Sequence, residues 1–131
     1  MRLNPDCTRD ILLALESCEL IDGSTTITFP DFDNVREELG LTAYTSRELE
    51  YHMRQCDMSG LLVGAKFGGS GTFSVIDITP DAHKFLADIR SKSLWSKAKE
   101  IGKQAGVLEL NALISIAHDI ASSAIQAHLG F

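Results

Sequence analysis

The sequence of 131 residues predicts a mixed α+β fold, and three observations lead to that class. Two segments open on a capping residue, a proline and an aspartate, at Asn4-Pro5-Asp6 and Thr79-Pro80-Asp81, which is typical of a helix start. One stretch rich in β-branched residues, at 25–29, and two of alternating character, at 61–67 and 72–78, are typical of short strands. The segments between them carry apolar residues at helical spacing, so helices and strands share one small domain.

The composition is that of a globular protein, with 44% hydrophobic and 23% charged residues, which argues against a disordered chain. The cysteines are three in number, Cys7, Cys18 and Cys56, and each falls on an apolar helix face. We therefore expect reduced, buried thiols rather than a disulfide framework. Met1 leads directly into a capped polar helix without a signal peptide, so a cytoplasmic location is expected.

The first part of the chain is expected to alternate helix, strand and helix. The first helix, at about 5–19, buries one face made of Cys7, Ile11, Leu12, Leu15 and Cys18. A turn at 22–24 leads into a strand at 25–29, which Pro30 ends. A short second helix over 31–39 follows and stops at Gly40.

The stretch 45–62 is the one around which the other elements are organised. Thr45 and Glu48 have the spacing of a capping box, and Leu49, Met53 and Cys56 recur on one face that should pack inward. Gly60 ends the helix, and the chain passes directly into a strand.

The second half is expected to form a hairpin followed by three helices. The strands 61–67 and 72–78 are joined by a glycine-rich loop, Gly68-Gly69-Ser70-Gly71. The helix that Thr79 caps comes next, then a basic helix at about 93–104, and a very apolar last helix at about 107–129.

This order is that of a winged helix-turn-helix domain, in which a recognition helix precedes a β-hairpin wing. We assign residues 1–90 to that domain. Residues 91–131 add two C-terminal helices, one basic and one apolar.

Several short motifs also carry resemblances. Ser59-Gly60-Leu61-Leu62 after the 45–58 helix, and the step 78–86, are similar to winged-helix repressors. A closer resemblance covers nearly the whole chain and is to a family of bacterial and prophage proteins known only as a domain of unknown function. Its motifs here are Leu3-Asn4-Pro5-Asp6-Cys7, Glu50-Tyr51-His52, Gly60-Leu61, Ile78-Thr79-Pro80, His83, Phe85-Leu86-Ala87, Ile89-Arg90 and Trp95. The resemblance implies a small winged-helix-like protein of phage or mobile elements and supplies no activity, although many members have glycine where this chain has Ala82.

The outward face of the 46–57 helix predicts a duplex-DNA interface. Side chains that read base edges or hold phosphates are expected there and at the wing: Arg47, Tyr51, Arg54, Gln55 and Lys66. Acids on the same helix, Glu48, Glu50 and Asp57, argue against this partner because they repel phosphates. The net charge is −6, and residues 1–63 carry twelve acids against five arginines. A host protein bound to the same scaffold therefore stays open as the alternative, since fold alone does not fix function.

The apolar last helix admits three interpretations: a membrane anchor, a cover for the domain's own core, or a dimer contact. A central Asp119 would cost on the order of 2.5–3.5 kcal/mol in a bilayer, which argues against the anchor. We favour a homodimer whose contact includes Leu110, Leu113, Ala117, Ile120, Ala121 and Ala124.

No catalytic or cofactor site is expected. The histidines and cysteines lack the pair-of-pairs spacing of a zinc site, and the loop 68–71 lacks the lysine and helix of a phosphate-binding loop. No Ser-His-Asp or Cys-His arrangement can be read from the sequence. We therefore predict a binding protein and not an enzyme.

Overall fold

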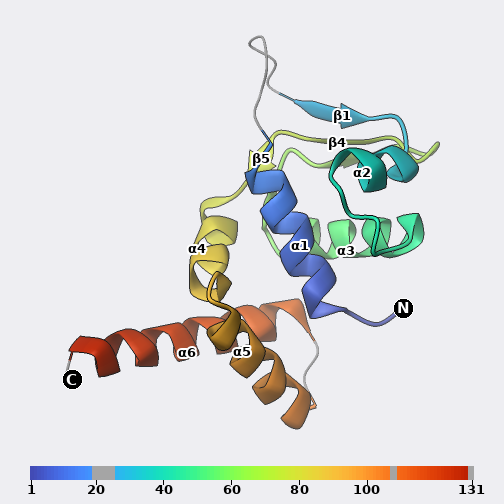
Figure 1. Ribbon diagram of the computed structural model, residues 1–131. Helices are drawn as coiled ribbons and strands as arrows, with labels where there is room; N and C mark the ends of the chain where they lie inside the picture. The colour runs from blue at the N-terminus through green and yellow to red at the C-terminus, as the bar shows by residue number, and fades with distance from the viewer. Residues whose placement is uncertain (19–25, 107–108, 130–131) are drawn as a thin grey trace.

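The computed structural model describes residues 1–18, 26–106 and 109–129 (Figure 1). Within these ranges the chain is a mixed α+β protein with six helices and two small antiparallel sheets, which confirms the predicted α+β class. The expected turn at 22–24 lies outside the described residues, as do the ends predicted at 19, 25 and 107.

Six helices account for most of the described residues. They are α1 (Pro5–Glu16), α2 (Phe32–Glu38), α3 (Ser46–Met58), α4 (Pro80–Ile89), α5 (Lys92–Gln104) and α6 (Leu110–Leu129). The predicted caps are confirmed at three of them. Asn4 Oδ1 accepts from the Asp6 N–H, Thr79 Oγ1 accepts from the Ala82 N–H, and Thr45 forms both halves of the capping box with Glu48.

Two antiparallel sheets lie above α3. The larger has the order β1-β4-β3, with β1 at Ile27–Phe29, β3 at Lys66–Phe67 and β4 at Phe73–Val75. The smaller pairs β2 (Leu62–Val63) with β5 (Asp77–Ile78). The central strand β4 thus joins a segment from the start of the chain, β1, to the local hairpin strand β3.

The hairpin departs from the sequence prediction, since each strand expected to be continuous is divided in two. Gly64 adopts a left-handed conformation, with φ +64°, which an extended strand does not accept. A Cβ at Gly64 would lie 2.5 Å from Ile76 Cδ1, so the two segments of the hairpin approach closely at this bend. The Ile76 N–H still donates to the Val63 carbonyl at 2.9 Å, which keeps the hairpin joined across the interruption.

The core is one contiguous cluster that runs from the sheet to the C-terminal helices. Under the sheet it is aromatic, with the rings of Phe29, Phe32, Phe67 and Phe73 in contact. Around α1 it is aliphatic, and the predicted inward residues Leu49, Met53 and Cys56 are fully buried. The interpretation of that face of α3 is confirmed.

The helices α4, α5 and α6 form the other end of the molecule (Figure 1). α6 packs across α5 and α4, and α1 contacts both α3 and α4. No helix in the part of the chain that the structure describes is long and apolar enough to cross a membrane.

Candidate nucleic-acid interface

The centre of the exposed face of α3 is a line of four side chains. Arg47, Tyr51, Arg54 and Met58 follow one another at spacings of four, three and four residues, so they lie on one side of the helix. This line is opposite the buried face of α3. This line contains two arginines and no acid. The sequence pattern alone does not distinguish it from the acids that lie beside it on α3.

Arg54 connects this line to the hairpin. Its guanidinium carbon lies 4.4 Å from the centroid of the Phe67 ring in β3, within the range of a cation–π contact. Its Nε also lies 3.9 Å from a carboxylate oxygen of Glu50, one turn earlier. Lys66, the neighbour of Phe67, is exposed. Arg54 therefore links the exposed line of α3 to β3, and we call that line together with Phe67 and Lys66 of β3 the α3–β3 face.

Tyr51 and Gln55 lie toward the other flank of α3. Both line a groove of about 500 Å³ whose remaining walls come from the N-terminal segment and the start of α6. The Tyr51 ring meets the buried His52 edge-on, with 5.0 Å between centroids. Arg2 lines the same groove and was not among the predicted site residues. No local sequence pattern indicates Arg2, because its place in the groove depends on how the N-terminal segment packs beside α3 and α6.

Three acids near the start of α3 have defined contacts. Glu48 accepts from the Thr45 N–H at 3.1 Å as part of the cap. Asp33 accepts a hydrogen bond from the Ser46 hydroxyl, and Glu50 pairs with Arg54. Acids outnumber basic residues by seven to four over 31–67, and three of them, Glu48, Glu50 and Asp57, lie on α3 beside the exposed line.

The inner side of α3 is fixed by a buried histidine. His52 is 1% exposed, and its Nδ1 lies 2.7 Å from the carbonyl oxygen of Glu48. Its Nε2 accepts from the Asn4 N–H at 2.7 Å. The two contacts assign the proton to Nδ1, because the ring must donate to a carbonyl and accept from an amide. The ring thereby ties the start of α1 to the middle of α3.

A protein-family model described as "Hypothetical protein (DUF2513)" matches residues 2–108. The chain belongs to this family. The matched residues include α1 to α5, and α6 lies beyond them. No curated protein and no solved structure matches the chain. The predicted membership in a family of unknown function is confirmed.

Four residues of the motifs that resemble the family, Asn4, Asp6, His52 and Trp95, form hydrogen bonds between helices. Besides the bond from Asn4 to His52, Trp95 Nε1 donates to Asp6 Oδ1 at 2.8 Å. Lys99 Nζ contacts the same oxygen at 2.9 Å. These contacts join α1, α3 and α5.

Two of the basic side chains at α5 and just before it are paired with acids of α1. Lys99 is engaged with Asp6, and Arg90 just before α5 donates to Glu16 at 2.8 Å. Lys92, Lys97 and Lys103 are exposed on α5.

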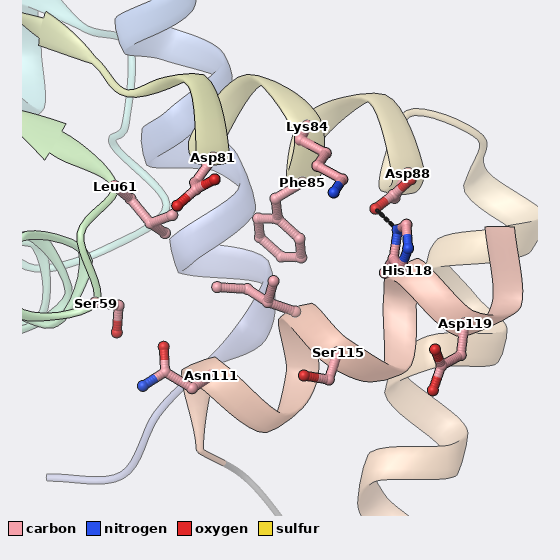
Figure 2. Close-up of a pocket in the computed structure, with 11 residues that line it drawn as sticks. Ser59, Leu61, Asp81, Lys84, Phe85, Asp88, Asn111, Ser115, His118 and Asp119 are labelled. Carbon is pink, nitrogen blue, oxygen red and sulfur yellow. Dashed lines mark ion pairs between the residues drawn. The ribbon is translucent and has the colours of Figure 1, made fainter. Parts of the chain in front are cut away.

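A second hollow, of about 430 Å³, lies between α4 and α6 (Figure 2). Figure 2 shows Phe85 on its inner wall and the pair of His118 and Asp88, whose Nδ1 and Oδ2 lie 3.4 Å apart, at one end. Within the described ranges, no group of three or more His, Cys, Asp or Glu side chains is placed to hold a metal ion.

The residues predicted for dimerisation are mostly buried within a single chain. Leu110, Leu113, Ala117, Ile120 and Ala121 of α6 belong to the chain's own buried residues, and Ala124 alone of the six is exposed. This placement matches the alternative in which α6 covers the domain's core. A contact with another subunit would have to use exposed residues, and Ala124 is the one member of this set that is exposed.

All three cysteines are free thiols. Burial raises the pKa of Cys7 to about 12 and raises that of Cys56 further still. Since the thiolate is the nucleophile, neither side chain is suited to covalent chemistry at neutral pH.

Proposed function

We propose that the protein binds duplex DNA through the α3–β3 face, as a winged-helix regulator of a phage or mobile element. The observation that carries the proposal is the acid-free line on α3. It places two arginines on the most exposed side of a helix and continues through Phe67 to Lys66 on the hairpin.

The order of the elements supports this proposal. Helix, strand, two helices, a hairpin and a further helix follow one another, and β4 pairs with β1 on one side and β3 on the other. In a winged helix-turn-helix domain the helix before the hairpin enters the major groove, and the hairpin lies along the backbone. The proposal assigns these two roles to α3 and β3.

The side chains suit these roles. Arginine binds guanine or phosphate with two parallel hydrogen bonds, and Gln55 can bind adenine in the same manner. Tyr51 and Lys66 are suited to phosphate. Glu50 and Asp57 flank the line and repel phosphates, so we expect modest affinity that weakens steeply as salt rises.

The test is fluorescence anisotropy with labelled genomic duplexes over a series of salt concentrations. Arg47→Ala and Arg54→Ala should each weaken binding by about 1–3 kcal/mol if they contact bases, or lower the salt slope by about 1 if they contact phosphate. The control is Lys103→Ala, which removes the same charge from the exposed surface of α5. Absence of binding at low salt would overturn the proposal.

A second candidate function is binding to a host protein on the same face. Met58 ends the α3 line with an apolar side chain that is 72% exposed, and Glu50 and Asp57 flank the line. Glu50→Gln separates the two functions. Loss of this acid should tighten binding to DNA, whereas it should weaken binding to a basic protein partner.

A further inference from the structure

Near its C-terminal end, α6 is exposed from residue 123 to residue 127. Within this segment, Ile125 is 59% exposed. Figure 1 shows this end of α6 extending past α4. The apolar stripe that is buried from Leu110 to Ala121 continues outward through Ala124, so the helix remains apolar where it becomes exposed.

A groove of about 390 Å³ runs between α5 and this end of α6. One wall belongs to α5 and presents Leu94, Lys97 and Ile101. The other belongs to α6 and is largely apolar with small side chains, and it comprises Asp119, Ile120, Ser123, Ala124 and Ala127. The groove is therefore apolar along its length, with a cation on one wall and an anion on the other.

We propose that this groove binds the same groove of a second copy of the chain. A two-fold interface brings one surface against itself, so it must be self-complementary. Lys97 on the α5 wall and Asp119 on the α6 wall meet that condition, because each lysine can face the partner subunit's Asp119.

The contact works by burial of apolar area, with the charges fixing orientation. Ile101 and Ala124 leave water, and the small residues on α6 let the two helices approach closely. The charge pairs lie at the edge of the groove, where they set the relative orientation of the copies more than the affinity. The groove shares no residue with the α3–β3 face, so the proposal does not depend on DNA binding.

Charge reversal in the full chain tests the proposal through sedimentation velocity over a concentration series. Wild type should show a monomer–dimer equilibrium. Lys97→Glu and Asp119→Lys should each raise the dimer Kd at least about tenfold, because each places two pairs of like charges in the interface. An equimolar mixture of the two variants should form a heterodimer, since both pairs become opposite charges again.

Recovery in the mixture cannot arise from effects inside one chain, which makes it the decisive measurement. Lys103→Glu makes the same charge change on α5 outside the groove and should leave the Kd unchanged. Ala124→Arg fills the groove and should abolish dimers. A wild type that is monomeric throughout the series, or a mixture that stays monomeric, would overturn the proposal. Circular dichroism of each variant establishes that it is folded.

Discussion

His52 joins the start of α1 to α3 through its two ring nitrogens. His52→Ala removes the donor to the Glu48 carbonyl, leaves the Asn4 N–H without its acceptor and opens a cavity. The free energy of unfolding should fall by about 2–4 kcal/mol, measured by urea titration.

His83→Ala is the matched control for that substitution. The His83 side chain is 53% exposed, and its Nδ1 lies 3.7 Å from a carboxylate oxygen of Glu16. Its loss should change stability by no more than about 0.5 kcal/mol. Equal effects of the two alanines would show that the buried hydrogen bonds of His52 contribute nothing.

Asp6 should make stability depend on pH in acid. Burial raises the pKa of this carboxyl, but hydrogen bonds from Lys99 and Trp95 outweigh it and hold the pKa below 3.8. A carboxyl with a lowered pKa stabilises the fold above its unfolded pKa, and this contribution is lost as pH falls through the folded value. Asp6→Asn should therefore cost up to about 1 kcal/mol at neutral pH. That difference from wild type should shrink below pH 3.8.

Asp81→Asn is the control, because Asp81 holds the same position after a cap and a proline in α4. Asp81 lacks the Trp95 and Lys99 contacts, so the effect of Asp81→Asn on the free energy of unfolding should change less with pH than that of Asp6→Asn. Urea titrations of the three proteins over an acid pH series give the comparison. Parallel curves for the two variants would contradict the role of the Asp6 network.

Sequence patterns predict the contacts made within one helix, and they miss the hydrogen bonds between residues far apart in the sequence. The cap at Asn4 and the inward side of α3 follow from spacing within one helix, and both are found. The bond from Asn4 to His52 joins residues 48 positions apart, and that from Trp95 to Asp6 spans 89. No spacing rule reaches so far, so these contacts become visible only once the helices are packed.

At the scale of one element, the capping box determines where α3 begins. Thr45 Oγ1 accepts from the Glu48 N–H at 3.1 Å, and the Glu48 carboxylate accepts from the Thr45 N–H. Thr45→Ala should lower stability by about 0.5–2 kcal/mol, measured by thermal or urea unfolding. Thr42→Ala, three residues earlier and exposed, should have almost no effect. Similar losses from both would mean that the cap contributes no stability.

Element types are predicted better than element continuity. The alternating character of 61–67 and 72–78 predicts the hairpin strands, yet the left-handed Gly64 divides the first of them, and the second is divided opposite it at Ile76. Glycine identity alone does not reveal the sign of φ. On α6 the apolar stripe was recognised, but its burial by α4 and α5 depends on the crossing of three helices, which periodicity does not specify.

For the whole molecule, the packing of α6 makes the C-terminal helices part of the same core. Leu113 is buried in the cluster that also contains Phe85, and Trp95 on α5 reaches α1 through Asp6. Leu113→Ala should therefore destabilise the entire chain by about 2–5 kcal/mol. Trp95 fluorescence and far-ultraviolet circular dichroism should shift together to lower urea in one transition.

The surface alanine substitution Ile125→Ala supplies the comparison, because that side chain lies on the exposed end of α6. It should leave the midpoint of the monomer nearly unchanged at low protein concentration. Two separate transitions in the Leu113 variant would instead favour independent units at 1–90 and 91–131.

The glycine-rich loop of the hairpin has a practical consequence. Gly68, Gly69 and Ser70 are exposed, and the Gly68 N–H donates to the Thr72 carbonyl at 2.7 Å, which closes the hairpin below the tip. Lengthening such a loop costs little free energy of loop closure, about 0.6 kcal/mol for each doubling of the loop length. Since Phe67 and Lys66 directly precede the loop, a cysteine-coupled fluorophore at Ser70 would sit beside the α3–β3 face. It would report any molecule that docks there, whether nucleic acid or protein, without replacing a side chain of that face.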